Sequence, residues 1–443
     1  DMEIIEEVIK INGGEDALLE VRTTHHGPII SDIRDDLNDV LALQWTQQEP
    51  SRILESVVLL NLAQNYDDFR EALRFWDVPS QNIIYADVEG NIAYQTPGLI
   101  PIRKNGTGEI PVPGWTGEYE WAGWIPYEEL PALFNPQQGY IVTANHAVVD
   151  QDYPHFLAGD WSTGDRGQRI NDLIASKINS GGKISMKDLA RMQFDNLSLP
   201  AQSYVPLMEG LSSDDADVQA AIERLRGWDM RETEDSVPTS LFEIFYIYLM
   251  YNVLVDDIGQ ENLDTLLPGN AKIIFMHDLA GQLNAHWWDN KNTAEEEAWQ
   301  DIILQSLTDG VDWLEENQGG RMNDWAWGKI HTITFEDAVL GASGVAPVEA
   351  IFNRGPFAVD SGRDLVNAQN WSNDDPAVVE SHASQRMLVD ISNLDNSLSV
   401  IPTGNSGHPY NEHYDDQMAL YLTGQYHPMP FSREAVEAAA VEH

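Results

Sequence analysis

Strand signals at both ends of the chain flank a helical middle, and this order constrains the fold more than any other feature of the sequence. Residues 1–170 are rich in strand and turn signals, residues 171–345 are mainly helical, and residues 346–443 return to strands and end in a polar tail. A sheet that helices interrupt and that is completed late in the chain is typical of an α+β domain. We therefore expect an α+β fold in which the middle segment is a helical insertion.

The spacing of apolar residues predicts the individual elements. Alternating or continuous apolar runs indicate strands, and apolar residues three and four positions apart indicate helices. Strands are expected at 23–30, 83–94, 386–392 and 398–402. Helices are expected at 66–76, 187–194, 218–228, 241–255, 293–317 and 335–340.

The most apolar run of the sequence extends from Leu241 to Val255, and Glu243 and Asn252 interrupt it. It is too short and too polar for a membrane-spanning helix. Ser240 and Glu243 together have the pattern of a capping box at its start. We interpret the run as a buried helix and expect no membrane insertion.

Acidic residues dominate the charge of the chain. Asp and Glu number 72 against 25 Lys and Arg, which gives a formal net charge of −47. Such a charge repels nucleic acid and anionic membranes, so nucleic-acid binding is excluded. Self-repulsion opposes compaction unless salt screens it. A halophilic protein is therefore one interpretation, and an acidic exported enzyme is the other.

Several common catalytic motifs do not occur in this sequence. The chain has no cysteine, which excludes disulfides, a Cys nucleophile and thiolate metal sites. It contains no G-x-S-x-G elbow, phosphate-binding loop, zinc-protease motif or EF-hand loop. Trp115, Trp121 and Trp124 lie in Gly/Pro turns, where a carbohydrate platform is conceivable but packing is more usual. The residues alone indicate an acidic α+β protein, with a hydrolase as one option.

Three blocks of sequence follow one another along nearly the whole chain. The first is Arg22-Thr-Thr-His-His-Gly-Pro-Ile-Ile-Ser31. The second begins at Tyr85-Ala-Asp-Val-Glu-Gly-Asn and continues through Gly139-Tyr-Ile-Val-Thr-Ala-Asn145 to Trp161-Ser-Thr-Gly-Asp-Arg-Gly-Gln-Arg-Ile170. The third joins Thr403-Gly-Asn-Ser-Gly407 to His413-Tyr-Asp-Asp416. In this order they resemble the β-subunit region, without its N-terminal segment, of the penicillin acylase (penicillin amidase) family of N-terminal-nucleophile hydrolases.

The resemblance implies part of a four-layer αββα sandwich and hydrolysis of a linear amide to a carboxylic acid and an amine. In this family a Ser that self-cleavage releases as a new N-terminus attacks the carbonyl, and its own α-amine acts as the base. Asp1 has no hydroxyl, so we expect the nucleophile upstream of this chain and expect the chain alone to be inactive. The implied partners are a small-molecule amide substrate, the α subunit of the same precursor and the missing N-terminal part of the β subunit.

Two site residues are carried over from the family by position. Asn145 stands where the family has an Asn whose side-chain amide binds the oxyanion, after a Gly-Tyr-Ile strand. A carboxamide suits this task because it donates a hydrogen bond without titrating. Arg166 stands where a family Arg supports the nucleophile region electrostatically. The structural alternatives are a turn residue for Asn145 and a surface ion pair for Arg166.

Other polar residues receive weaker assignments. His25 and His26 have the chemistry of a general base, but the family base is the N-terminal amine, so a packed or orienting role is expected. The resemblance implies no organic cofactor. It does imply a structural calcium whose ligands come largely from outside this chain, and Asp160 lies near one ligand position but out of register. The metal ligands are therefore unassigned.

The sequence leaves several alternatives for the acyl group that is cleaved. Penicillins, N-acyl amino acids and acyl-homoserine lactones all fit a linear amide, and an acyl-homoserine-lactone acylase is the main alternative within the enzymes. From another class, the alternative is a binding or scaffold chain that keeps the fold without catalysis. The resemblance also implies a periplasmic or secreted protein that is processed from a zymogen.

Overall fold

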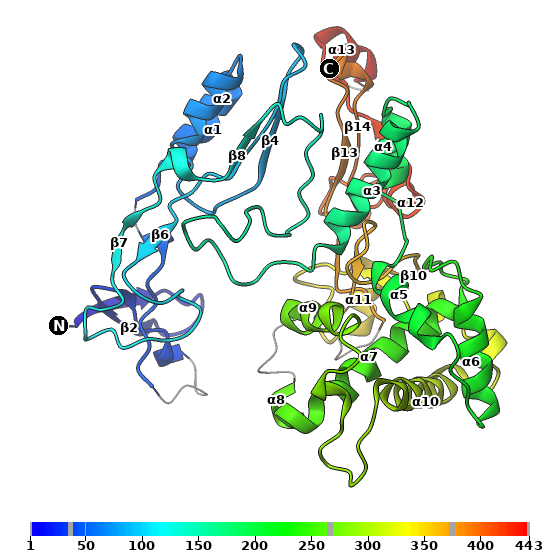
Figure 1. The fold of residues 1–443 in the computed structure, drawn as a ribbon. Helices are drawn as coiled ribbons and strands as arrows, with labels where there is room; N and C mark the ends of the chain where they lie inside the picture. The colour runs from blue at the N-terminus through cyan, green and yellow to red at the C-terminus, as the bar shows by residue number, and fades with distance from the viewer. Residues whose placement is uncertain (1, 34–38, 49, 264–268, 372–376, 441–443) are drawn as a thin grey trace. The chain divides into compact units, whose positions relative to one another are not determined.

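The computed structural model describes residues 2–33, 39–48, 50–263, 269–371 and 377–440 (Figure 1). The chain forms two compact units. The first comprises residues 1–143 and 147–159, and the second comprises residues 144–146 and 160–443. The expected boundaries at 170 and 345 stay a prediction.

The first unit begins with an antiparallel sheet of three strands, β1 (Glu3–Ile9), β2 (Ala17–Thr24) and β3 (Gly27–Pro28). The strand expected at 23–30 is therefore split by a tight turn at His25 and His26. The turn requires Gly27, whose φ of +127° favours glycine. A Cβ at this position would also meet a backbone carbonyl oxygen at 2.1 Å.

Two helices follow in this unit, α1 (Ile53–Leu62) and α2 (Tyr66–Leu73). Asn65 caps α2 by accepting a hydrogen bond from the backbone N–H of Asp68 at 2.9 Å. The helix buries Phe69 and Leu73, and the Phe69 ring lies 4.9 Å from the ring of Tyr85 on the neighbouring sheet. The helix expected at 66–76 is confirmed, with an earlier end.

The remaining strands of the first unit form two small sheets. Their bounds are β4 (Ile83–Ala86), β5 (Ile92–Gln95), β6 (Pro101–Arg103), β7 (Trp121–Trp124) and β8 (Ala132–Phe134). The sheets have the orders β4-β5-β8 and β6-β7, and all pairs are antiparallel. The strand expected at 83–94 is a hairpin, because the carboxylate of Asp87 accepts the N–H groups of Glu89 and Asn91 and fixes a turn.

The second unit contains most of the helices of the described chain. Their bounds are α3 (Asp165–Asn179), α4 (Met186–Met192), α5 (Leu199–Tyr204), α6 (Ala216–Arg226), α7 (Val237–Ile258), α8 (Gln260–Leu263), α9 (Gly269–Leu279), α10 (Trp299–Gln318), α11 (Ala346–Phe352), α12 (Met418–Leu422) and α13 (Arg433–Ala439). The helices expected at 187–194, 218–228, 241–255 and 293–317 correspond to α4, α6, α7 and α10.

Helix α7 is the centre of the larger hydrophobic core. Its side chains Phe242, Phe245 and Leu249 are fully buried and pack with residues of α6 and α10. Gly310 on α10 allows the two helix backbones to approach closely, since a Cβ there would lie 3.2 Å from the backbone nitrogen of Phe245. Burial of each large apolar side chain contributes about 1.5–3 kcal/mol, so this cluster fixes the helical part of the unit.

The capping box expected at Ser240 and Glu243 is wrong. Helix α7 begins one turn earlier, where Ser236 accepts a hydrogen bond from the N–H of Thr239 at 3.1 Å. Pro238 lies in the first turn, where its missing N–H costs nothing. Ser240 and Glu243 are instead interior residues of the helix, and both are buried.

The strands of the second unit form small antiparallel sheets. Their bounds are β9 (Thr332–Phe335), β10 (Arg354–Ala358), β11 (Gln369–Asn370), β12 (Ser381–His382), β13 (Arg386–Leu388), β14 (Leu398–Val400) and β15 (His427–Pro428). Figure 1 shows β13 and β14 side by side, and the sheet order is β13-β14-β15. Ile333, Val400 and Tyr421 form a second core around these strands.

The helix expected at 335–340 is also wrong. Phe335 ends β9, and the following residues form a turn. The carboxylate of Asp337 accepts hydrogen bonds from the N–H groups of Val339 and Leu340 at 3.1 and 2.8 Å. This local bonding competes with the helical pattern that the apolar spacing indicated. Among the described residues, no helix is long and apolar enough to cross a membrane.

Candidate functional site

Asn145 lies in a bend within the second unit. Its φ of +64° places the backbone in the left-handed region, which Asn tolerates better than most residues. Its carbonyl oxygen accepts a hydrogen bond from the N–H of Ser162 at 3.0 Å. This bond holds the bend beside the segment that leads into α3, while the Asn145 side chain stays exposed.

Arg166, in the first turn of α3, contacts the side chain of Asn145. Its Nη2 donates to Oδ1 of Asn145 at 2.9 Å and to Oγ of Ser162 at 3.3 Å. A guanidinium only donates, so the carboxamide must present its oxygen to Arg166 and keep its two N–H groups for another acceptor. The structure therefore brings together the two residues that the sequence singled out, and it orients the amide as a donor.

Two glycines explain the local sequence around Arg166. Gly164 precedes α3 with a φ of +94°, which favours glycine. A Cβ on Gly167 would lie 2.5 Å from Nδ1 of His146, so only glycine leaves room for that imidazole. The segment Gly-Asp-Arg-Gly thus packs α3 against the residue that follows Asn145.

Sequence reasoning missed His146. Its Nδ1 is buried without a hydrogen-bond partner among the described residues, and burial together with the nearby charge of Arg166 lowers the pKa of the imidazole. The ring is therefore neutral at physiological pH and packs between the bend and α3. The sequence signal that could have pointed to His146 is the pair Gly164 and Gly167, since closely spaced glycines leave room for a neighbouring side chain at the start of α3.

Two acidic residues, Asp165 and Asp364, lie near Arg166. Asp165 is buried, and one of its oxygens lies 3.6 Å from Nε2 of His277. Asp364 has a left-handed backbone with a φ of +60°. Burial raises the pKa of Asp364, and the charges of Arg363 and Arg166 partly offset that rise. The charge of Arg166 is thus close to carboxylates as well as to Asn145.

Glu232 and Glu243 form a second acidic pair deeper in the unit. Both carboxyls lie against Gly362, where a Cβ would be 2.4 Å from Oε2 of Glu232 and 3.8 Å from Cδ of Glu243. Burial and the neighbouring carboxyl raise the pKa of Glu232 well above its ordinary value. Burial also raises the pKa of Glu243, to about 7. Two buried carboxyls in contact cannot both ionise cheaply, so the pair holds a proton near neutral pH.

A small pocket lies between Asp364 and Glu243 and is lined by both side chains. It is lined by polar and aromatic side chains together with two apolar residues, namely Pro200, Glu243, Tyr246, Ile273, Arg363, Asp364 and Trp371. The guanidinium of Arg363 lies 4.2 Å from the centre of the Trp371 ring. None of these residues was singled out from the sequence as a site residue, and Glu243 was noted there only as part of a capping box, because they are far apart along the chain and carry no functional motif.

Asp195 has a structural role. Arg169 on α3 binds both of its carboxylate oxygens, at 2.6 and 2.8 Å, and Arg231 lies 3.5 Å away. These partners lower the pKa of Asp195 although burial opposes them. The bidentate ion pair fixes α3, and with it the position of Arg166.

The expected calcium finds no ligand set among the described residues. Asp160 is exposed and belongs to no group of three metal-binding side chains there. The group of this kind that the described residues contain is His25, His26 and Glu120, in the first unit. Because its ligands are expected largely from outside this chain, the calcium stays a prediction. The side chain of His25 is 66% exposed, so it is not packed, and the orienting role expected for the two histidines stays a prediction.

The fold has a counterpart among solved structures. It matches a thermostable penicillin G acylase from Alcaligenes faecalis with a TM-score of 0.69 and 18% identity, covering 100% of this chain and 81% of that one. This likeness defines the fold of the chain as that of a penicillin-acylase-type hydrolase. The penicillin amidase family model matches residues 1–438, and the chain belongs to this family. The resemblance noted in the sequence is therefore confirmed.

Curated relatives fall into two groups by name. An acyl-homoserine lactone acylase QuiP from Pseudomonas aeruginosa is 27% identical over 94% of this chain and 53% of its own length. A penicillin acylase 2 proenzyme from a Pseudomonas species is 28% identical over 98% of this chain and 54% of its own length. The chain thus spans about half the length of these relatives.

Proposed function

We propose that this chain is the greater part of the catalytic β subunit of an amide hydrolase of the penicillin amidase family. The proposed reaction cleaves a linear amide into a carboxylic acid and an amine. The nucleophile is an N-terminal Ser that lies upstream of Asp1 and that self-cleavage of a precursor releases. Membership of the family over residues 1–438 supports this assignment.

The observation that carries the proposal is the hydrogen bond from Arg166 to Oδ1 of Asn145 at 2.9 Å. It leaves the amide N–H groups of an exposed side chain oriented for an external acceptor. In the proposed reaction that acceptor is the carbonyl oxygen, which becomes negatively charged as the hydroxyl adds to the carbonyl carbon. A donor that is fixed before the reaction stabilises this charge without reorganising.

The proposed roles of the neighbouring groups are indirect. Arg166 is a positioning residue that fixes the amide and adds positive charge near the oxyanion. His146 fills the space between the bend and α3 as a neutral ring. No step of the proposed mechanism uses an organic cofactor or a metal ion. The arrangement of the whole enzyme as a four-layer αββα sandwich and its export from the cytoplasm belong to the same proposal.

The proposed substrate class is a linear amide, and the identities of its acyl and amine parts are left open. Relatives named for penicillin and for acyl-homoserine lactones match at similar identity. The second candidate within the enzymes is therefore an acyl-homoserine-lactone acylase. A panel of phenylacetyl, fatty-acyl and homoserine-lactone amides, measured with the matured full-length protein, separates these candidates. No turnover of any amide would favour a scaffold protein instead.

The test of the site uses two variants of Asn145 in the matured full-length protein. Asn145→Asp keeps the shape and an acceptor for Arg166 but removes the N–H donor, whereas Asn145→Ala removes both. Both are expected to lower kcat by roughly 10²–10³, with a smaller change in KM, because the donor acts mainly in the transition state.

A matched control is Asn135→Ala. Asn135 is also exposed and has a positive φ of 46°, but it lies in the first unit and bonds to Asn91. Maturation of every variant is checked first by subunit size, so that lost processing is not mistaken for lost chemistry. Near-full kcat in a correctly matured Asn145→Asp would overturn the assignment.

A further inference from the structure

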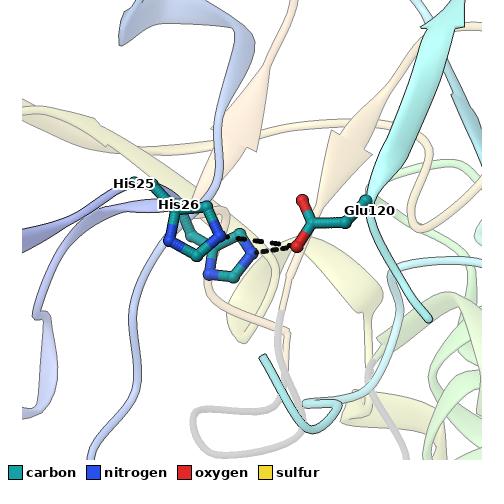
Figure 2. A group of neighbouring side chains, drawn as sticks. All are labelled: His25, His26 and Glu120. Atoms are coloured by element: carbon teal, nitrogen blue, oxygen red, sulfur yellow. Dashed lines mark hydrogen bonds and ion pairs between the residues drawn. The ribbon is translucent and has the colours of Figure 1, made fainter. Parts of the chain in front are cut away.

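Three side chains from two hairpins of the first unit converge on one point (Figure 2). His25 and His26 form the turn between β2 and β3, and Glu120 directly precedes β7. Oε1 of Glu120 lies 3.0 Å from Nε2 of His26 and 3.4 Å from Nε2 of His25. All three ligand atoms lie within 4.8 Å of one another.

The backbone holds these side chains in place. Oγ1 of Thr24 accepts a hydrogen bond from the N–H of His26 at 3.2 Å and donates to the carbonyl oxygen of Gly27 at 3.3 Å. The carbonyl oxygen of Glu120 accepts from the N–H of Lys104 on the neighbouring segment at 3.0 Å. The convergence therefore rests on hydrogen-bonded turns and strand ends.

We propose that His25, His26 and Glu120 form a binding site for a zinc-like divalent transition metal ion. Two imidazole nitrogens and one carboxylate oxygen are a ligand set that zinc uses, whereas calcium and magnesium prefer oxygen ligands alone. A tetrahedral ion with bonds of about 2.0–2.1 Å separates its ligand atoms by about 3.3 Å. The two distances from Glu120 already match this separation.

The electrostatics of the cluster suit a cation. Hydrogen bonds from His26 and His25 lower the pKa of Glu120, so its carboxylate is charged at neutral pH. The two rings lie 3.7 Å apart between centroids, so both imidazoles can offer a nitrogen to one shared cation. The side chain of His26 is 15% exposed and that of His25 is 66% exposed, so an ion can enter from solvent. Water completes the fourth position.

The ion would join the β2–β3 turn to the start of β7 and so stabilise the first unit. This role is separate from the proposed amide hydrolysis, which uses no metal. It also differs from the expected calcium, because the ligands here are mainly nitrogen atoms.

The experiment titrates zinc into the metal-stripped full-length protein that contains this chain. Calorimetry is expected to show one zinc ion bound per chain at this site, and cobalt(II) is expected to give the visible absorption of a tetrahedral complex. His25→Ala, His26→Ala and Glu120→Gln should each weaken binding at least about tenfold. Glu120→Gln keeps a hydrogen-bonding group, so it is the variant least expected to unfold.

His155→Ala is the matched control. Nε2 of His155 lies 2.6 Å from a carboxylate oxygen of Glu129 in the same unit, but no second histidine joins that pair among the described residues. This variant should bind zinc as the unaltered protein does. Excess calcium should not compete. Zinc binding that is absent, or that survives unchanged in folded Glu120→Gln and His26→Ala, would overturn the proposal.

Discussion

Arg166 donates a hydrogen bond to Oδ1 of Asn145 and thereby fixes which end of that side chain faces solvent. The two residues are held by different structures, since Asn145 lies in a left-handed bend and Arg166 in the first turn of α3. The contact therefore forms only when the bend at Asn145 packs next to the first turn of α3.

Replacing Arg166 by Ala should lower kcat by about tenfold, which is less than the effect expected for Asn145→Ala. The reason is that Arg166 acts largely through Asn145, so the double variant should be little worse than Asn145→Ala alone. Steady-state kinetics of the single and double variants measure this coupling. Arg433→Ala, at an exposed position, is the control. Fully additive losses would show that Arg166 acts independently of the amide.

Gly167→Ala should lower both stability and activity. The new Cβ would lie 2.5 Å from Nδ1 of His146, so the ring must shift next to Asn145. Overpacking of this kind costs about 1–3 kcal/mol of unfolding free energy. The second substitution His146→Ala should relieve the clash and restore part of the loss. Gly407→Ala, where nothing lies within 4 Å, is the control for denaturation and kinetics. A neutral Gly167→Ala would contradict the packing described here.

Stability should depend on pH through Glu232 and Glu243. Burial raises the folded-state pKa of Glu243 to about 7 and that of Glu232 well above its ordinary value, whereas an unfolded Glu titrates near ~4.3. Between these limits the folded protein binds more protons than the unfolded chain. The contribution of the pair is therefore present below about pH 4.3 and is lost as the pH rises through about 7.

The variant Glu243→Gln tests this dependence. The amide of this variant cannot ionise. As the pH rises from about 5 to about 8, the unfolding free energy of the variant should therefore fall by less than that of the unaltered protein, and the difference should be on the order of a few kcal/mol. Chemical denaturation at both pH values gives the difference. Glu209→Gln makes the same change of charge at an exposed residue and should follow the unaltered protein. Parallel pH curves for Glu243→Gln and the unaltered protein would refute the shared proton.

Salt should stabilise the protein. The chain carries a formal net charge of −47, and screening shortens the Debye length from ~10 Å at 0.1 M salt to ~3 Å at 1 M. Repulsion between surface carboxylates then falls, so Tm should rise between these two KCl concentrations. Differential scanning calorimetry measures the shift. A constant or falling Tm would count against the halophilic interpretation.

The helical middle and many element positions could be predicted from the sequence. Apolar residues that recur three and four apart located α4, α6, α7 and α10, because a buried helix face imposes that period. The same rule failed at 335–340, where Asp337 bonds to its own backbone, and it missed α3, whose polar face is wide. Capping was misplaced at α7 because Ser236 and Pro238 lie before the apolar run begins.

The sequence by itself determined the family and the identity of Asn145 and Arg166 as candidates, since both lie in continuous motifs. Only the tertiary structure showed that the guanidinium holds the amide oxygen, that His146 fills the space beside Gly167, and that Glu232 and Glu243 meet at Gly362. It also brought His25 and His26 to Glu120. These contacts join residues that are distant in sequence, and their distances follow from how the helices and hairpins pack, which local periodicity does not encode.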